Sequence, residues 1–401
     1  MSMVIDDVVG RETRHLLQTY RRQPVTFVRG EGVRLFDSDG KEYLDLLSGI
    51  GVASLGHAHP GLARAISEQV QTLIHTSNLF FHPLQGQLAE RLANLSGLPR
   101  AFFCNSGTEA VEACLKFARR YWYTRNEPRS EFVALDESFH GRTFGSLSVT
   151  SDDHYRKPFE PLLQSVRFVK TNDMAALTAA VSTSTAAIIV EPVLGEGGIR
   201  PLTPAFAARI NEVCAKTGAL CIADEVQSGI GRTGYPFYFA AIGLKPDLVA
   251  IGKALGGGVP VGAALVSQDV ADTISFGDHG TTYGGNLLAC RAALYVLDQL
   301  VGGGLLAHIG RIGHHVEQRL RTIAAKHTIV KEVRGRGLMW GLELTRDAGP
   351  VVPAALDRGL VVNRTAETVV RLLPPLIITQ AEADEALDRL DAALGAVGAV
   401  E

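Results

Sequence analysis

The sequence predicts an α/β protein with a large domain on a mostly parallel central sheet and a smaller α+β domain built from both termini. Two observations predict this fold. Four short, almost wholly apolar runs occupy residues 131–135, 186–190, 219–223 and 247–251. Such runs are typical of strands covered on both faces, as in a parallel sheet. Helical patterns alternate with them, which indicates layers of helix packed on sheet.

Local signals support a helix between the second and third of these runs. Thr203 is a suitable N-cap, Pro204 suits the first turn, and Gly218 follows the last apolar position. Proline early and glycine just after the end are the usual asymmetry of a helix. We therefore expect this helix to cross from one parallel strand to the next.

The two ends of the chain carry different patterns. Residues 31–46 read as a hairpin with its turn near Asp39 and Gly40. The last helix has a capping box, Thr379 with Glu382 three residues later.

From these patterns we expect three segments. Residues 1–60 form the N-terminal part of the small domain, residues 61–300 the large domain, and residues 301–401 the C-terminal part of the small domain.

Composition excludes several classes of protein. The chain has 401 residues, 39 Lys and Arg and 42 Asp and Glu, hence a net charge of −3. This balance argues against a nucleic-acid partner. No apolar run approaches the ~20 residues of a membrane span, and the start lacks a signal-peptide pattern. Five scattered cysteines indicate free thiols in a reducing cytoplasm. The twelve histidines show no ligand motif, so we expect no metal site.

One glycine motif suggests a different class of enzyme. Residues 229–234 fit GxGxxG, which would indicate a nicotinamide-dependent oxidoreductase. That fold needs a helix to begin at the motif and an acidic residue about 20 positions later. The aromatic, proline-broken residues 235–239 follow instead, and position 254 is alanine. The oxidoreductase remains a remote alternative.

Residues 105–110 indicate the start of a helix that follows a strand. Ser106 and Glu109 form a capping box, and Gly107 occupies the first turn. Glycine weakens a helix but lets a ligand approach exposed N–H groups. A helix N-terminus is a ready site for phosphate, although a capped helix without a ligand fits this motif equally well.

Two charged residues follow predicted buried strands. Asp224 ends one strand, where a carboxylate is costly unless a cation or donors satisfy it. Lys253 follows the next strand, where partial burial can lower the pKa of its amine and make it a nucleophile. A structural salt bridge and a solvated lysine are the alternatives. A phosphate cup, a buried carboxylate and such a lysine at one sheet edge are together the parts that pyridoxal 5′-phosphate needs.

An ordered series of motifs makes the chain similar to one known family. The motifs occupy residues 55–60, 105–110, 139–142, 190–192, 195–198, 224–234, 253–258 and 281–286. In order and spacing they resemble the class III (ornithine-type) aminotransferases of fold type I, over about residues 20–380. Within that class, residues 76–80 make the chain look most like the acetylornithine-type members.

The resemblance implies roles at the cofactor. Lys253 would carry the cofactor and move a proton between the substrate carbon and the cofactor's C4′. Asp224 would bind the ring nitrogen, Gln227 the phenolic oxygen, and Val226 would pack on the ring. Phe139 would stack on the pyridine face.

It also implies how the phosphate is held. Gly107 and Thr108 would bind it from one subunit, and Thr282 would reach it from the other. Thr281 of the other subunit would lie beside the substrate. The working unit would then be at least a homodimer with shared active sites.

The implied reaction moves the δ-amino group of N2-acetylornithine to 2-oxoglutarate. The products would be N-acetylglutamate 5-semialdehyde and glutamate, a step of arginine biosynthesis. Arg142 would bind the distal carboxylate, and Arg371 the α-carboxylate of 2-oxoglutarate and glutamate, since arginine pairs with carboxylates in a bidentate manner. Glu196 would pair with Arg371 while the δ-amino donor is bound. Tyr20 aligns more loosely with a donor-contacting tyrosine.

Ile50 bears on the choice of substrate. Ornithine δ-aminotransferases carry tyrosine at the matching place, whereas acetylornithine-type members carry an aliphatic residue. An apolar wall there disfavours a free α-ammonium and tolerates an acyl group. The 4-aminobutyrate enzymes also accept an aliphatic residue, so succinylornithine, ornithine and 4-aminobutyrate transaminases stay open as alternatives.

Overall fold

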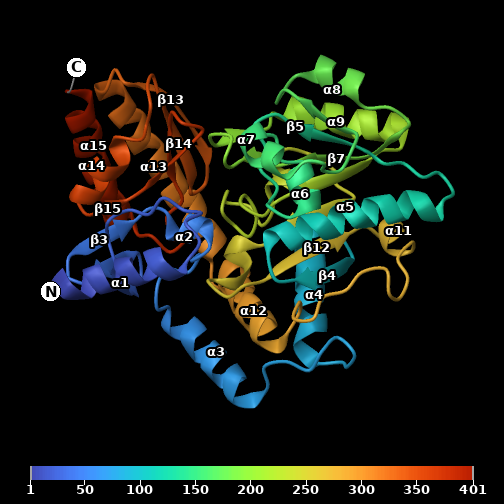
Figure 1. Ribbon diagram of the computed structural model, residues 1–401, viewed down its shortest axis with the longest axis horizontal. Helices are drawn as coiled ribbons and strands as arrows, with labels where there is room; N and C mark the ends of the chain where they lie inside the picture. The colour runs from blue at the N-terminus through green and yellow to red at the C-terminus, as the bar shows by residue number, and fades with distance from the viewer. Residues whose placement is uncertain (1, 400–401) are drawn as a thin grey trace.

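The chain forms two lobes, one from its middle and one from its two ends (Figure 1). A computed structural model describes residues 2–399, with side chains from residue 8 onward. The N- and C-terminal parts of the chain lie together in the same lobe, and residues from about 100 to 280 lie in the other.

The larger lobe is built on a seven-stranded sheet. Its strands, in spatial order, are β4 (Arg100–Cys104), β12 (Gly262–Val266), β11 (Leu248–Ile251), β10 (Leu220–Asp224), β7 (Thr185–Val190), β5 (Glu131–Leu135) and β6 (Val166–Val169). Strand β12 is antiparallel to both of its neighbours, and the other pairs are parallel. The predicted mostly parallel sheet is therefore confirmed.

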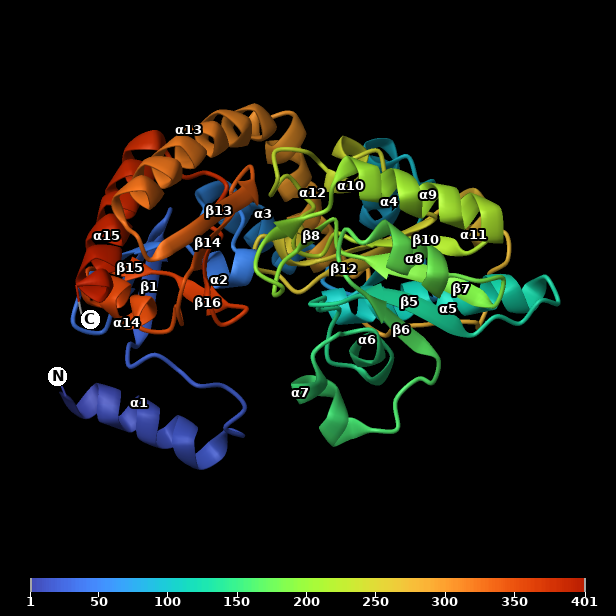
Figure 2. The same cartoon turned by 90° about the horizontal axis from the view of Figure 1, so that it is seen from above.

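Helices cover both faces of this sheet (Figure 2). Helix α5 (Gly107–Thr124) packs on one face, and α9 (Pro204–Thr217) lies on the other. Side chains of β5 alternate between two buried clusters, with Phe132 on the α5 face and Val133 on the α9 face. This alternation is the period of two that a strand imposes, and it explains why the strands read as continuous apolar runs.

Further helices, two 3₁₀ turns and a small hairpin complete the larger lobe. The helices are α3 (Pro60–Thr72), α4 (Pro83–Ser96), α6 (Phe144–Ser148), α7 (Asp153–Arg156), α8 (Met174–Ala180), α10 (Tyr238–Ala241), α11 (Gln268–Ala271) and α12 (Leu287–Val301). The 3₁₀ turns are η1 (Lys157–Phe159) and η2 (Lys253–Gly256), and a small hairpin consists of β8 (Val193–Leu194) and β9 (Arg200–Pro201).

The lobe formed by the chain ends holds two four-stranded sheets. One contains β1 (Phe27–Glu31), β2 (Arg34–Asp37), β3 (Glu42–Asp45) and β15 (Leu360–Val361); the other contains β13 (Val330–Arg336), β14 (Met339–Leu344), β17 (Val369–Leu372) and β16 (Asn363–Thr365). Its helices are α1 (Ser2–His15), α2 (Ser48–Gly51), α13 (Leu305–Lys326), α14 (Val351–Asp357) and α15 (Gln380–Gly398). The pairing of β3 with β15 joins the two ends of the chain. Domain boundaries at residues 60 and 300 remain our prediction.

The local signals in the sequence act as expected. The Thr203 side chain caps α9 by accepting from the N–H of Phe206, and Gly218 ends that helix in the left-handed region with φ +79°. Thr379 and Glu382 form the capping box of α15. Strands β2 and β3 pair as the predicted hairpin.

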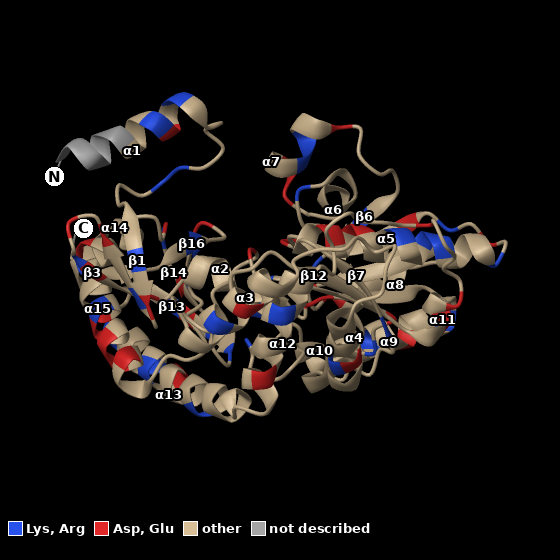
Figure 3. Cartoon of the chain, turned by 90° about the horizontal axis from the view of Figure 1, so that it is seen from below, with Lys and Arg blue, Asp and Glu red and all other residues tan. Residues whose placement is uncertain are grey.

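Charged residues of both signs line the outer helices of the terminal lobe (Figure 3). Helices α13 and α15 are joined by ion pairs between Arg319 and Asp388 and between Lys326 and Asp391. Exposed pairs of this kind each contribute little to stability, typically below about 1 kcal/mol.

Among the described residues, no single helix has the length and apolar character needed to cross a membrane. Helices α12 and α13 meet that criterion only when counted together, and they are bent by 65° relative to each other.

Candidate active site

The carboxyl ends of six strands meet at one edge of the large sheet, since only β12 runs in the opposite direction. Strand β10 ends at Asp224, and its neighbour β11 is followed by Gly252 and Lys253. Strand β4 leads into α5 at the same edge, because β12 is antiparallel to both β4 and β11. In open α/β sheets, ligands bind at this edge. The fold therefore brings together the three features that the sequence singled out.

The first turn of α5 lies directly against the loop that follows Asp224. Its N–H groups, at Gly107 and Thr108, have no acceptor within the helix. A Cβ at Gly107 would stand 2.5 Å from Val226 Cγ1, so only glycine lets the turn approach this closely. Ser106 Oγ accepts from the N–H of Glu109, at 3.3 Å.

One detail of the predicted capping box differs. The Glu109 carboxylate accepts from the N–H of Asn105, at 2.7 Å, rather than from the N–H of the cap residue Ser106. The box thus closes one residue earlier than the sequence motif predicts.

Thr108 connects the helix start to the loop after β5. Its hydroxyl lies 2.7 Å from Ser146 Oγ and 3.1 Å from Thr143 Oγ1, and it accepts from the N–H of Arg142 at 3.2 Å. Three hydroxyl groups and a helix N-terminus thus converge, which is a suitable surface for a phosphate group.

Asp224 is 4% exposed, and both of its oxygens have partners. One oxygen accepts from the N–H of Val226 at 3.0 Å, and the other lies 2.7 Å from His140 Nδ1. Because a carboxylate only accepts, Nδ1 carries the proton. The Nε2 atom of His140 is buried without a partner. Sequence reasoning assigned His140 no chemistry; its place beside Phe139 was the available signal.

Glu191 was also missed as a functional residue. It follows β7, is 5% exposed, and accepts from the N–H groups of Phe139 and Gly195 at 2.9 and 3.0 Å. Burial raises the pKa of Glu191 to about 7, against the opposing influence of His140. Its carboxyl group ties the loop that carries Phe139 to the start of the β8–β9 turn.

Lys253 is partly buried and strained. Its φ of +38° is unusual for a residue other than glycine, and such strain concentrates at functional sites. Burial lowers the pKa of the Lys253 amine below its ordinary value of 10.5, Glu196 raises it, and Arg371 lowers it. The net direction is downward, so more of the amine is uncharged at neutral pH than in an ordinary lysine.

Arg371 lies on β17 and is 1% exposed. Its Nη1 atom lies 2.5 Å from Glu196 Oε1 and 3.3 Å from Gln227 Oε1, and its Nε donates to Asn363 Oδ1 at 3.2 Å. Burial raises the pKa of Glu196, but the charges of Arg371 and Lys253 and the hydrogen bonds from Arg371 and Thr365 together outweigh it, so the net pKa is lowered. The ion pair that the resemblance implies is therefore present.

Phe139 and Arg142 lie on the same loop. The Arg142 guanidinium lies 3.6 Å from the centre of the Tyr155 ring and 5.5 Å from that of Phe139. Arg142 is exposed, and no carboxylate among the described residues forms an ion pair with it. An exposed arginine on aromatic rings remains free to bind a substrate carboxylate.

Ile50 and Tyr20 are less directly connected to these groups. Ile50 is 40% exposed and has a φ of +64°, an outlier for a β-branched residue. Its helical turn is held near the site by Ser48, which donates to the carbonyl of Leu373, two residues after Arg371. Tyr20 is 76% exposed on the segment after α1.

Thr281 and Thr282 lie on a loop at the surface. Thr281 Oγ1 accepts from Asn105 Nδ2 at 3.3 Å, and Thr282 is exposed. Several large apolar side chains are also exposed, among them Leu79, Phe81 and Phe276.

The GxGxxG pattern does not form a dinucleotide site. Its residues lie in turns, and the next helix, α10, has only four residues. Arg232 within the pattern is fully buried and donates to the carbonyls of Leu338 and Pro374. The motif connects the two lobes instead. The described residues also contain no group of three or more His, Cys, Asp or Glu side chains able to hold a metal ion.

Comparison with known proteins identifies the family. The profile of the family Aminotransferase class-III matches residues 17–394. The chain belongs to the class-III aminotransferases. It is 45% identical over 377 residues to the acetylornithine aminotransferase of Aquifex aeolicus, covering 94% of this chain and 98% of that protein.

Solved structures agree with this family. The ornithine aminotransferase of Toxoplasma gondii matches with a TM-score of 0.94 at 32% identity, covering 98% of this chain and 95% of that one. The N-acetylornithine aminotransferase of Stenotrophomonas maltophilia matches with a TM-score of 0.85 at 34% identity, covering 98% and 100%.

Class-III aminotransferases are pyridoxal-phosphate-dependent enzymes, and the site fits that cofactor. The start of α5 offers its N–H groups and the neighbouring hydroxyls of Thr108, Thr143 and Ser146 to a phosphate group. The buried carboxylate of Asp224 is positioned by His140 as an acceptor for a ring nitrogen. Lys253 supplies an amine whose pKa is lowered by burial. Each part of the cofactor thus has a chemically matched group.

Proposed function

We propose that this class-III aminotransferase moves the δ-amino group of N2-acetylornithine to 2-oxoglutarate. The products are N-acetylglutamate 5-semialdehyde and glutamate, and the reaction is a step of arginine biosynthesis. The observation that carries the proposal is the agreement among relatives. Curated proteins from bacteria, archaea and a plant, each 43–45% identical over most of the chain, are named acetylornithine aminotransferases.

Lys253 is the base in this proposal. Bound pyridoxal phosphate supplies the electron sink for the breaking C–H bond. The uncharged amine of Lys253 would take the proton from the substrate carbon and would deliver it at C4′ of the bound cofactor. The lowered pKa of Lys253 suits both roles, since a protonated amine can neither attack nor accept a proton.

Other residues hold the cofactor. The N–H groups of Gly107 and Thr108 bind its phosphate, and Asp224 keeps the ring nitrogen protonated by pairing with it. Gln227 would contact the phenolic oxygen, Val226 would pack on the ring, and Phe139 would stack on the pyridine face.

Two arginines recognise the substrates. Arg142 binds the carboxylate distant from the reacting carbon. Arg371 binds the α-carboxylate of 2-oxoglutarate or glutamate, and Glu196 occupies Arg371 when the δ-amino donor is bound. The exposure of Arg142 and the observed pairing of Arg371 with Glu196 support this division.

The apolar side chain of Ile50 favours an acylated donor over free ornithine, because it offers no partner for a second ammonium group. Tyr20 contributes a further contact to the donor. Succinylornithine and 4-aminobutyrate are the donors that this argument leaves as competitors.

We also propose that the enzyme is a cytoplasmic homodimer. All five cysteines are free thiols, as a reducing compartment favours. Thr282 of the partner subunit would reach the phosphate, and Thr281 of the partner subunit would lie beside the substrate.

An absorbance titration of the purified holoenzyme tests the proposal. N2-acetylornithine should convert the visible band of the bound cofactor to the amino form, and 2-oxoglutarate should restore it. If ornithine or 4-aminobutyrate drives the change with the higher kcat/KM, the donor assignment is wrong. If no cofactor binds, the site assignment is wrong as well.

A further inference from the structure

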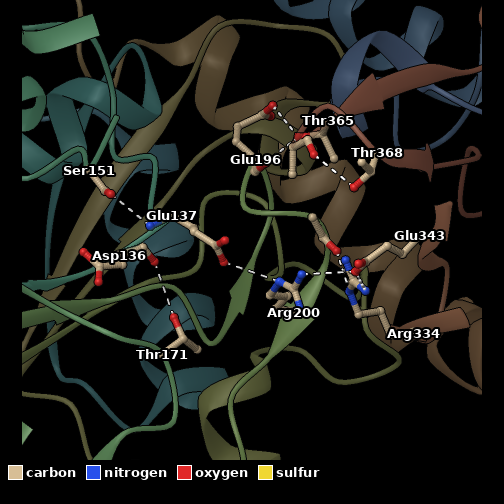
Figure 4. A network of polar contacts seen from close by, with 12 residues as sticks. Asp136, Glu137, Ser151, Thr171, Glu196, Arg200, Arg334, Glu343, Thr365 and Thr368 are labelled. Carbon is tan, nitrogen blue, oxygen red and sulfur yellow. Dashed lines mark hydrogen bonds and ion pairs between the residues drawn. The ribbon is translucent and has the colours of Figure 1, made fainter. Parts of the chain in front are cut away.

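One edge strand of the terminal lobe faces the ion pair between Arg371 and Glu196. This strand, β16, pairs with β17, which carries Arg371. The side chain of Asn363, the first residue of β16, accepts from Arg371 Nε. Thr365, the last residue of β16, points toward Glu196 (Figure 4). The strand therefore supplies one polar contact to each member of the pair.

The Thr365 hydroxyl contacts Glu196 in two places. It lies 2.5 Å from the main-chain oxygen of Glu196 and 3.3 Å from carboxylate Oε2. Thr365 is 6% exposed, so water has little access to compete for these contacts. The shorter contact fixes the backbone of Glu196, and the longer one favours the side-chain position in which Oε1 meets Arg371.

The turn that carries Glu196 is anchored on its other side as well. Arg334 Nε donates to the carbonyl of Gly198 at 2.7 Å, and Arg334 also pairs with Glu343. A Cβ on Gly198 would lie 2.9 Å from Arg334 Nη2, so this contact is close-packed. With the backbone held at both ends, the Glu196 side chain is the part of the turn that is free to move.

We propose that Thr365 is a positioning residue that holds Glu196 on Arg371 and thereby sets the competition between the two substrates. The inference rests on the proposed function, in which a dicarboxylate displaces Glu196 and the δ-amino donor does not. Thr365 stabilises only the paired arrangement, because the contact with Oε2 is lost when the carboxylate swings away. Removing the hydroxyl should therefore favour dicarboxylate binding.

The test uses the holoenzyme and glutarate, a five-carbon dicarboxylate with no amino or keto group to react. Binding is measured by isothermal titration calorimetry, which needs no turnover. Thr365→Val keeps the shape of the side chain and removes the hydroxyl, so glutarate should bind about threefold more tightly, the effect of losing one modest hydrogen bond. Thr365→Ser should restore the wild-type affinity.

A matched control lies on the same turn. Thr368 donates to the carbonyl of Ala366, at 3.3 Å (Figure 4), and among the hydrogen bonds of the described residues none joins its hydroxyl to Glu196. Thr368→Val should leave glutarate affinity unchanged. Glu196→Gln removes the displaced charge itself and should tighten glutarate binding more than Thr365→Val does.

The kinetic signature follows from the same argument. In Thr365→Val, KM for 2-oxoglutarate should fall, and 2-oxoglutarate should become a stronger competitive inhibitor against the amino donor, because it occupies Arg371 more readily. A loss of kcat for both half-reactions with unchanged KM would indicate general damage and would overturn the inference.

The glutarate affinities of the variants distinguish the role of Thr365 from the proposed role of the Arg371–Glu196 pair. If Glu196→Gln tightens glutarate binding and Thr365→Val does not, the inference about Thr365 is wrong and the proposed pairing stands. If neither substitution changes glutarate affinity, the proposed role of the pair is wrong. If Thr365→Val lowers the melting temperature markedly, the glutarate affinities of Thr365→Ala and Thr365→Ser are compared instead. The inference requires that the alanine variant bind glutarate more tightly than the serine variant.

Discussion

The charge state of Lys253 depends on a small number of neighbouring residues. Burial lowers the pKa of its amine, Glu196 raises it, and Arg371 lowers it. Glu196 and Arg371 also form an ion pair with each other, so a substrate that separates them changes the field at the base. Binding of a substrate carboxylate at Arg371 therefore changes the pKa of the Lys253 amine.

The first prediction concerns this field. Glu196→Gln removes a charge that raises the pKa of Lys253, so that pKa should fall further below 10.5. Arg371→Met removes a charge that lowers it, so the pKa should rise. The rate at which the apoenzyme takes up pyridoxal phosphate, followed across pH, reports the fraction of uncharged lysine. Wild-type midpoints in both variants would contradict the electrostatic account, and Thr368→Val should serve as the unchanged control.

Sequence reasoning identified the residues whose position is locally determined. Asp224 and Lys253 follow recognisable strands, and Gly107 follows a recognisable cap, so each could be placed at the sheet edge. The roles of His140 and Thr365 could not be predicted. His140 meets Asp224 across 84 residues of sequence, and Thr365 meets Glu196 across 169. The first contact depends on the order of strands in the large sheet and the second on how the two lobes pack, and no local pattern encodes either.

At the scale of elements, the start of α5 is the part most constrained by its neighbours. The helix is 18 residues long and well capped, so its stability does not require glycine in the first turn. Glycine at position 107 is required by the approach of Val226, 2.5 Å from where a Cβ would stand. Glycine weakens a helix by about 1 kcal/mol relative to alanine, and the close contact with Val226 explains why it is nevertheless present at this position.

The second prediction compares two glycines in helices. Gly107→Ala should push the helix start away from Val226 and weaken pyridoxal phosphate binding at least about tenfold, since misplaced donors lose hydrogen bonds to a charged group. Gly86→Ala in α4 is the control, because a Cβ there meets nothing within 4 Å. It should retain the cofactor and raise Tm slightly. Equal cofactor affinity in both variants, measured by fluorescence titration, would refute the close-approach argument.

Strands were predicted better than the turns that carry function. The four apolar runs became β5, β7, β10 and β11 with ends shifted by at most one residue. The β8–β9 turn, which presents Glu196, contains strands of only two residues and gave no periodic signal. Its shape depends on Glu191 and Arg334, which reach it from separate elements.

At the scale of the whole molecule, a charged cluster joins the lobes near the site. Glu343 on β14 accepts from Lys331 at 2.9 Å and Arg200 at 3.1 Å, and it also pairs with Arg334. Arg200 extends the cluster to Glu137 in the larger lobe (Figure 4). Burial raises the pKa of Glu343, but the hydrogen bonds from Lys331 and Arg334, together with the charges of Arg334 and Arg200, outweigh it and lower the pKa to about 2.

The third prediction follows from this shift. Because the folded-state pKa of Glu343 is lowered from 4.5, its stabilisation is present above pH 4.5 and is lost as pH falls toward 2. Glu343→Gln should lower Tm at pH 7 by roughly 3–5 °C, since it leaves cations without a counter-charge. The difference from wild type should shrink below pH 4.5. Glu332→Gln, at a half-exposed partner of Arg334, should change Tm much less.

The fourth prediction concerns assembly of the proposed shared site. Thr282 is exposed in the single chain, and the proposal places it at the phosphate of the partner subunit. Lys253→Ala and Thr282→Asp should each be inactive as homodimers, the first for want of the base and the second because its carboxylate repels the phosphate. Their heterodimer combines an intact Lys253 from one chain with an intact Thr282 from the other. After denaturation and random reassociation, about a quarter of all sites should be native.

That recovery distinguishes a shared site from one contained in a single chain. If Thr282 acted on the phosphate of its own subunit, each site in the heterodimer would keep one defect, and mixing would restore nothing. Activity should therefore rise to about a quarter of the wild-type value per site when equal amounts are reassociated, and should stay at zero when the proteins are mixed without denaturation. A double variant that carries both substitutions on one chain, reassociated with wild type, should likewise keep one defect in each heterodimer site. It should therefore give about a quarter of native sites, all from wild-type homodimers, whereas sites within single chains would give about half.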